Sequence, residues 1–427
     1  MDVAPITLIV DTEAGVLVRE IPNASPLRDD IARGVAAEEA THDAAALWGL
    51  PDFVYDAQIR RVGVGSREIG DCLLLVGGLG VVVQVKSRNV STSDEEKERR
   101  WIEKKAAQGL DQANGTIRQL KRAPASMTNG RNRTVEIDGN AVRWLIAVVI
   151  DHPDVPAGII PDLGKSQSEA VVVLRGDWEF LFEQLKSTYA VARYFERVAG
   201  EPMELGQEPI RYFKLANADH EASPEPVHPK LLTPNSRQLS SPLLPLLPAA
   251  SEDRMAHLLV RSIFEDIATH GLTQVSETMR LRVLAELDRF PVSDRGAEVG
   301  RYLLEALGAV VKAPSTTTEW RLRSAVGSTE GERVAHLCFG ACSKFSDLHL
   351  ERFSWWVQLR HSEIQQVMAL GATLNTVGVL LTPRTDGERP WDTTMVAAFG
   401  DLGLTKRDLS AYRSFWGNRS SPGKVIE

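Results

Sequence analysis

The stretch Gly70-Asp-Cys-Leu-Leu-Leu-Val-Gly-Gly-Leu-Gly-Val-Val-Val-Gln-Val-Lys-Ser-Arg88 contains two apolar runs separated by glycines. Short runs rich in Val and Leu on either side of a Gly-rich turn predict a β-hairpin whose strands lie in a core. If the turn is centred on Gly78 and Leu79, the numbers of facing residues sum to about 157. This register predicts that Asp71 lies near Lys86.

Polar side chains collect at the open end of this hairpin. Residues two apart share a face of a strand, so Gln84 and Lys86 should point the same way while Val85 points into the core. Oxygen ligands from a carboxylate, an amide and a backbone carbonyl suit Mg²⁺, with Mn²⁺ as a substitute, and such a cation stabilises phosphate charge and activates water. We therefore expect Asp71, Gln84 and the Val85 carbonyl to bind metal and Lys86 to assist.

Helices and strands alternate around the hairpin. The pattern predicts helix, three strands, helix and strand, which makes an α/β sandwich around a mixed sheet. The expected elements are a hairpin over 6–10 and 16–20, a helix over 27–48, strands over 53–62, 71–76 and 80–85, a helix over 94–122, strands over 142–150 and 171–174, and a helix over 177–197.

The pattern Asp-(x)n-(Glu/Gln)-x-Lys on a hairpin, after a helix that bears a glutamate, resembles the PD-(D/E)XK nucleases. The Gln-x-Lys form is similar to their Mrr-type restriction endonuclease branch. Gly34-Val-Ala-Ala-Glu38, followed by Leu47-Trp-Gly49, is similar to the first helix of that branch. The resemblance spans residues 27–120 or so. It implies a restriction-endonuclease-like fold, Mg-dependent hydrolysis of DNA in defence against foreign DNA, and a metal or water-orienting role for Glu38, with Glu39 as a less favoured substitute.

An inactive site is the alternative. Gln84 in place of Glu removes one negative charge from the metal ligands, and the chain carries a net charge of −8. The same fold would then serve as a nucleic-acid-binding or assembly module.

Local charge favours a nucleic-acid partner. Between residues 86 and 133 there are twelve Lys or Arg residues and six acidic residues, so this segment is positive within an acidic chain. Phosphate contacts come from such residues, although a solvated helix face with internal ion pairs is equally compatible. The candidate contacts are Arg88, Arg99, Arg100, Lys104 and Lys105.

A proline-rich composition separates two parts of the chain. Prolines recur through residues 217–250 and prevent a helix or a central strand, which predicts an interdomain linker. We expect a nuclease-like domain over 1–216 and an α+β domain over 251–427. Helices over 252–269, 274–288, 298–307 and 354–370 and strands over 320–326, 334–341 and 377–381 are expected there. Its helix-then-hairpin order suggests a degenerate copy of the first domain that serves recognition or assembly.

The remaining composition narrows the setting. The three cysteines, Cys72, Cys338 and Cys342, do not form a disulfide framework, and His336 with Cys338 and Cys342 does not match a strong zinc signature. No signal peptide is evident, and no run reaches the roughly 18 apolar residues of a membrane helix. We expect a cytoplasmic protein without a membrane partner. A homodimer is compatible with two cuts in a duplex, and an activating protein partner is compatible with the same sequence.

Overall fold

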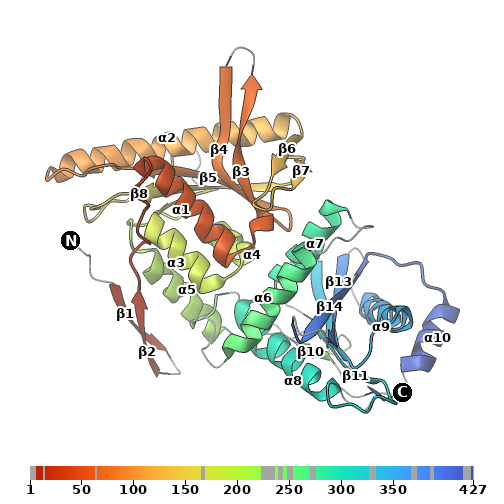
Figure 1. The fold of residues 1–427 in the computed structure, drawn as a ribbon. Helices are drawn as coiled ribbons and strands as arrows, with labels where there is room; N and C mark the ends of the chain where they lie inside the picture. Colours follow the sequence, from red (N-terminus) through yellow and green to blue (C-terminus); the bar gives the residue numbers. More distant parts are fainter. Residues whose placement is uncertain are drawn as a thin grey trace. The chain divides into compact units, whose positions relative to one another are not determined.

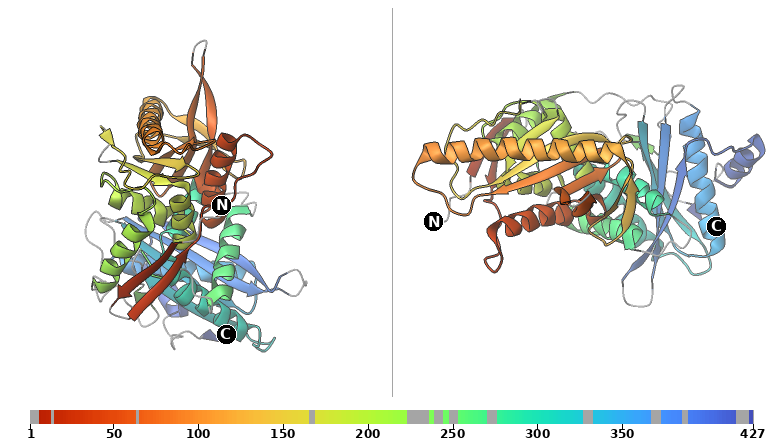
Figure 2. Two further views of the ribbon diagram at one scale, coloured as in Figure 1. Left: turned by 90° about the vertical axis from the view of Figure 1, so that its left-hand side faces the viewer. Right: turned by 90° about the horizontal axis from the view of Figure 1, so that it is seen from above.

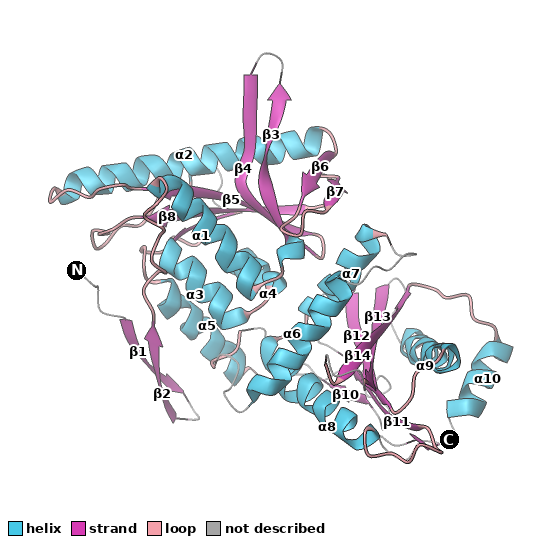
Figure 3. Ribbon diagram, viewed as in Figure 1, coloured by secondary structure: helices cyan, strands magenta, loops and turns pink. Residues whose placement is uncertain are grey.

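A computed structural model describes residues 6–12, 15–62, 65–164, 169–222, 236–238, 244–247, 253–269, 276–326, 333–366, 373–384, 389–416 and 425–426. The chain divides into two compact units, Met1–Ala222 with Leu243–Pro248 and Ser223–Pro242 with Ala249–Glu427. Both units combine helices with a mixed β-sheet, so the α/β class expected from the sequence is confirmed (Figures 1 and 3). None of the described helices is long and apolar enough to cross a membrane.

The first unit is built on a five-stranded sheet. Its order is β3 (Val54–Val62), β4 (Gly65–Val76), β5 (Leu79–Ser87), β8 (Arg143–Asp151) and β9 (Ala170–Leu174). The first three strands form an antiparallel meander, whereas β8 and β9 run parallel to β5. The Val- and Ile-rich central strands are buried on both faces, as expected where helices cover both sides of a sheet.

Helices cover both faces of this sheet. The crossover helix α2 (Glu95–Arg122) joins β5 to the parallel strand β8 and contacts one face. The other face is contacted by α1 (Arg33–Trp48), α3 (Arg175–Leu185) and α4 (Thr188–Val198), so the strands lie between α2 and α1 (Figure 2). The chain continues into α5 (Glu208–Glu221).

Local backbone conformation divides the helix expected over 177–197 in two. Lys186 has a left-handed φ of 47° that ends α3, and the Ser187 hydroxyl then accepts a hydrogen bond from the Ala190 amide and caps α4. The hairpin β1 (Ile6–Thr12) and β2 (Gly15–Ile21) is present as expected. The hairpin β6 (Ala125–Thr128) and β7 (Thr134–Ile137) and the helix α5 have no counterpart among the expected elements.

The register expected for the central hairpin is wrong by two residues. The turn is Gly77-Gly78, with positive φ at both glycines as in a type I′ turn, and Val76 pairs with Leu79. Cys72 therefore faces Val83. A shift of two preserves which residues share a face, so the side chains of Asp71, Gln84 and Lys86 still lie on one side of the sheet.

The second unit contains a sheet of order β10-β11-β12-β13-β14, with β15 paired to β11. β10 runs parallel to β11, and β12 runs parallel to β13, to which a helix joins it. The pairs β11–β12 and β13–β14 are antiparallel. The end of the helix expected over 354–370 lies outside the described residues. The bounds are α6 (Arg254–Thr269), α7 (Glu277–Asp288), a π-helical turn (Asp294–Gly300), α8 (Arg301–Val310), β10 (Ser236–Gln238), β11 (Glu319–Val326), β12 (Arg333–Cys342), α9 (Asp347–Gln365), β13 (Thr373–Pro383), β14 (Trp391–Phe399), α10 (Lys406–Trp416) and β15 (Val425–Ile426).

Short pieces of the segment expected as a linker belong to one unit or the other. Helix α5 extends to Glu221, so the expected start at residue 217 is too early. Leu244 is fully buried, and the Pro245 carbonyl accepts hydrogen bonds from Gln184 and Tyr212 of the first unit. The edge strand β10 pairs with β11 of the second unit. Most of the remaining linker lies outside the described residues.

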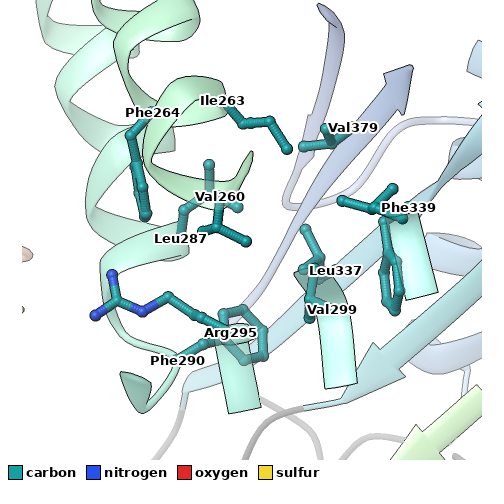
Figure 4. A pocket seen from close by; sticks show the side chains of 11 residues that line it. Val260, Ile263, Phe264, Leu287, Phe290, Arg295, Val299, Leu337, Phe339 and Val379 are labelled. Carbon is teal, nitrogen blue, oxygen red and sulfur yellow. The ribbon is translucent and has the colours of Figure 1, made fainter. Parts of the chain in front are cut away.

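The core of the second unit contains a small cavity of about 30 Å³ (Figure 4). Its lining is apolar except for Arg295, whose Nη1 donates to Asp288 Oδ1 at 3.2 Å and whose guanidinium lies over the Phe264 ring. A space of this size holds about one water molecule. The cavity is therefore a packing feature of the core.

Candidate active site where two strands diverge

The residues singled out on the hairpin lie at the point where β4 and β5 separate. Cys72 and Val83 form the last pair between the two strands, and Asp71 and Gln84 come directly after it on β4 and β5. Beyond this point β4 continues beside β3, while β5 continues beside β8. Diverging strands leave backbone and side-chain polar groups without a neighbouring strand, so this is a place where a sheet can open a site.

Three oxygen atoms surround the ammonium of Lys86. Its Nζ donates to Gln84 Oε1 at 3.2 Å and to the Val85 carbonyl at 3.0 Å, and lies 3.7 Å from Asp71 Oδ2. Asp71 Oδ2 also accepts a hydrogen bond from the Val85 amide at 2.5 Å, which ties the diverging strands together. The four residues expected to act together on the hairpin are thus brought together.

The site is mostly enclosed and contains opposing charges. The side chains of Lys86 and Asp71 are 12% and 15% exposed. Burial lowers the pKa of the Lys86 ammonium, and the carboxylates of Asp71 and Glu38 oppose this shift, while Lys105 adds to it. Glu38, which is exposed on α1, is therefore among the charges that act on the Lys86 ammonium.

The same oxygens suit a hard divalent cation. An ammonium at their centre shows that the Asp71 carboxylate, the Gln84 amide and the Val85 carbonyl converge on one position for a cation. Mg²⁺ prefers such a set of oxygen ligands, so these residues fit the expected metal. Only Asp71 among them is anionic, and within the described residues no group of three or more His, Cys, Asp or Glu side chains is arranged for a metal.

Helix α2 approaches the sheet closely above Gln84 because it has a glycine there. A Cβ at Gly109 would lie 2.8 Å from Val148 Cγ1 and 3.6 Å from Gln84 Cβ. The missing side chain lets the helix rest on the strands next to the site. The same helix carries Lys105, whose Nζ donates to Gln108 Oε1 at 2.9 Å.

Asp151 holds elements next to the site in place through hydrogen bonds, although the sequence patterns did not predict a role for it. It ends β8, is buried, and accepts from Ser87 Oγ at 2.8 Å and Arg33 Nε at 2.9 Å on Oδ2, and from Arg175 Nε at 3.0 Å on Oδ1. Ser87 follows Lys86 directly, and Arg33 begins the helix that carries Glu38. Asp151 thus joins β5, α1 and α3. The pattern that could have revealed it in the sequence is an acidic residue at the carboxyl end of a buried strand.

Two arginines expected to contact nucleic acid are engaged within the protein. Arg88 donates from Nε and Nη2 to the buried carboxylate of Glu98 at 2.9 and 2.8 Å. Thr92 and His152 complete the shell of Glu98, and the hydrogen bonds from Arg88 hold the pKa of that carboxyl well below its usual range. Arg99 donates to the backbone carbonyls of Ala157 and Gly158.

The other candidate contacts lie on the surface of α2. Arg100 and Lys104 are exposed, and Lys105 is half-buried beside Gln108. Arg100 forms an i,i+4 pair with Glu96 at 3.3 Å, which at this exposure stabilises the helix only weakly. These three cations remain accessible to a phosphate.

Glu39 takes no part in the site. Its Oε2 accepts from Arg28 Nη1 at 3.2 Å, and it lines a hollow of about 500 Å³ between the loop 22–28, α1 and α3. Neighbouring positions on a helix point about 100° apart, which explains why Glu38 and Glu39 serve different surfaces.

The second unit repeats part of the topology but not the polar residues. Both units contain an antiparallel hairpin, a crossover helix and a parallel strand: β4-β5-α2-β8 and β11-β12-α9-β13. On the second hairpin, Trp320, Leu322, Cys338 and Cys342 are buried in the core cluster that includes residues of α9. Cys338 Sγ lies 3.8 Å from His336 Nε2, while His336 Nδ1 contacts Thr376 Oγ1.

No protein family, curated protein or solved structure was found that matches this chain, so its function must be inferred from its own geometry.

Proposed function

We propose that the first unit is a metal-dependent endonuclease of the PD-(D/E)XK type that hydrolyses phosphodiester bonds of DNA. The observation that carries this proposal is the convergence of Asp71, Gln84 and the Val85 carbonyl on one cation position, with Lys86 inside it. The order α1, β3-β4-β5, α2, β8 supports a restriction-endonuclease-like fold, because it places a helix with Glu38 before the meander and a crossover helix after it.

The residues of the site have distinct roles in this proposal. Asp71, Gln84 and the Val85 carbonyl would hold Mg²⁺, which when bound stabilises negative charge on the phosphate and activates water. The Lys86 ammonium, which lies among the same oxygens, would neutralise negative charge that develops on the phosphate. Glu38 orients water from the α1 side.

Supporting residues fix this geometry. The Val85 amide donates to Asp71 Oδ2 and orients that carboxylate, and Asp151 accepts hydrogen bonds from Ser87 and from Arg33 at the start of α1. A hydrogen-bonded shell around ligands keeps them in position and typically raises metal affinity 10- to 100-fold.

A second function is favoured by one observation. Lys86 already satisfies the oxygen atoms that a metal would need, and one carboxylate is the only anion among them. A site neutralised in this way suits an inactive nuclease fold that binds nucleic acid or assembles with partners. In either case the second unit, whose corresponding hairpin lacks the Asp, Gln and Lys set, would act in recognition or assembly as a degenerate relative of the first.

Cleavage of supercoiled plasmid with Mg²⁺ or Mn²⁺ tests the proposal. We expect metal-dependent nicking by the wild type and a loss of at least about 100-fold in Asp71→Ala and Lys86→Ala, since removal of one charge-stabilising group costs this much in comparable sites. Glu39→Ala is the matched control, because this carboxylate lies next to Glu38 in sequence but outside the site. It should nick like the wild type.

The outcomes separate the two functions. Nicking that survives both substitutions would mean that the catalytic residues lie elsewhere. Plasmid binding without nicking by the wild type would favour the inactive, nucleic-acid-binding fold.

A further inference from the structure

Strand β14 forms one edge of the sheet in the second unit. Its residues, Trp391–Phe399, pair with β13 in an unbroken antiparallel register, from Asn375 opposite Phe399 to Pro383 opposite Trp391. Among the described strands, β13 is the only one that pairs with β14. In an antiparallel pair the backbone groups of alternate residues point away from the partner strand. Strand β14 therefore presents a row of amides and carbonyls at an open edge.

The neighbouring helices leave this edge accessible. Thr393 Oγ1 donates to Asp266 of α6 on one face of β14. On the other face, Ala398 belongs to the apolar cluster that includes residues of α9. Every residue of the strand except Ala398 is half-buried rather than buried. The two helices therefore pack on the faces of β14 and do not enclose its edge.

The opposite end of the same sheet is protected against further pairing, whereas β14 is not. There β11 is followed by β10, which has three residues, and by β15, which has two. Short edge strands, lysines, prolines and bulges are the usual means by which proteins prevent an edge from pairing with another chain. Strand β14 has nine residues, contains neither lysine nor proline, and pairs with β13 without a bulge. It is therefore suited to the addition of another strand.

The sequence of β14 is complementary to itself. If two β14 strands pair antiparallel about a two-fold axis at Met395, all nine residues of each strand are paired, and a shift in either direction leaves residues without a partner. Trp391 then faces Phe399, and Asp392, the one charged residue of the strand, faces Ala398. Aromatic cross-strand pairs stabilise a sheet, and facing like charges would destabilise it. This pairing contains two aromatic pairs and no facing like charges.

The charge of Asp392 is already balanced within one copy. Its Oδ1 accepts hydrogen bonds from Arg384 at 3.1 Å and from Arg389 at 3.2 Å. A two-fold contact uses the same surface on both copies, so it closes the assembly at two chains. The short strands at the other end of the sheet favour the same closure. The occupant that fits this edge is therefore a second copy of the chain.

We propose that β14 pairs antiparallel with β14 of a second copy of this chain and joins the two sheets of the second units into one. This pairing gives the assembly role of the second unit a defined surface and partner. It holds whether or not the first unit cuts DNA. A dimer also brings two copies of the first unit into one assembly, as two cuts in a duplex require.

Sedimentation of the full chain with EDTA and without DNA tests the pairing. We expect the wild type to sediment with about twice the 47.0 kDa of one chain. Met395→Lys places two ammonium groups opposite each other at the two-fold axis and should raise the dissociation constant of the dimer at least about tenfold. Val311→Lys is the matched control, because it introduces the same charge at an exposed apolar residue of the same unit, and it should dimerise like the wild type. Thermal unfolding of both variants checks that they fold.

A cysteine at the axis tests the register of the pairing. In Met395→Cys the two Cβ atoms would lie about 4.5–5.5 Å apart, close to the separation in a disulfide. Ala397→Cys is the control on the same face, because it would lie four residues, or about 14 Å, from its equivalent in the other copy. The three native cysteines are buried. We therefore expect oxidation to cross-link Met395→Cys but not Ala397→Cys, as seen by electrophoresis without reductant.

Three results would overturn the pairing. The first is a wild type that stays monomeric at about 100 μM, where a complex with a Kd of about 1 μM is almost fully formed. The second is a dimer that Met395→Lys weakens no more than Val311→Lys does. The third is cross-linking of Ala397→Cys as fast as that of Met395→Cys. Failure of the nuclease proposal gives a different result, namely a dimer that depends on β14 without plasmid nicking.

Discussion

Replacement of Lys86 by Met separates metal binding from catalysis. The substitution keeps a long apolar side chain and removes the ammonium that lies among the oxygens of Asp71, Gln84 and Val85. A cation that enters this position must first displace that ammonium. We therefore expect Lys86→Met to bind Mn²⁺ more tightly than the wild type while nicking is lost.

The size of the effect can be calculated from the geometry of the ion pair. Charges 3.7 Å apart, as for Lys86 Nζ and Asp71 Oδ2, attract by about 4.5 kcal/mol at an effective dielectric constant of about 20. Lysine recovers part of this attraction by hydration as it moves out, so about a third to two thirds of it opposes metal binding. Since each tenfold in affinity corresponds to about 1.4 kcal/mol, Lys86→Met should bind Mn²⁺ about 10- to 100-fold more tightly.

Electron paramagnetic resonance of free Mn²⁺ measures this affinity directly, and competition with Mg²⁺ extends it to the other cation. Asp71→Asn is the matched control, because it removes the single anionic ligand and should weaken binding in both the wild-type and the Lys86→Met background. Equal Mn²⁺ affinity in the wild type, Asp71→Asn and Lys86→Met would refute the assignment of these oxygens as a metal site.

Two further predictions concern packing and protonation. Gly109→Ala places a Cβ 2.8 Å from Val148 Cγ1, so overpacking should cost about 1–3 kcal/mol and exceed the gain of about 1 kcal/mol in helix propensity. We expect this variant to have a lower free energy of unfolding in urea. Gly308→Ala is the control, because a Cβ there meets open space in α8, and it should raise or preserve the free energy of unfolding. Burial lowers the pKa of His336 to about 3 from 6.5, so the contribution of this residue to stability is complete well above pH 6.5. It falls by about 2 kcal/mol as the pH drops from about 7.5 to 5, because the unfolded chain takes up a proton that the folded state excludes. Denaturation of His336→Gln across this pH range should show a flatter profile, and an unchanged profile would exclude His336 as its source.

The residues of the candidate site could be predicted from local sequence patterns, because turns and strand alternation depend on residues within a few positions of one another. Gly77-Gly78 between Val- and Leu-rich runs specifies a hairpin, and strand alternation then places Gln84 and Lys86 on one face whichever even register forms. The actual turn differs from the expected one by one residue at each position. The face is unchanged, because the two-residue error in register equals the period of a strand.

These local patterns could not predict contacts between residues far apart in the chain. Asp151 forms salt bridges with Arg33 and Arg175, which join elements far apart in the chain. Arg88 forms a salt bridge with Glu98, which fixes the loop after β5 against α2. Buried charges must find partners, but which partner each finds depends on how helices pack on the sheet. Arg88 could therefore be assigned to phosphate from its charge alone, although its guanidinium binds Glu98.

The sequence by itself determined the five strands of the first sheet, the crossover helix and the polar residues of the hairpin, since these depend on periodicity and turn chemistry within a few residues. Only the tertiary structure decided that β4 leaves β5 at Asp71, that the Lys86 ammonium takes the cation position, and that β14 ends the second sheet as an open edge. These features arise from pairing between strands and from desolvated charges that must be satisfied, and both depend on which segments meet in the folded chain.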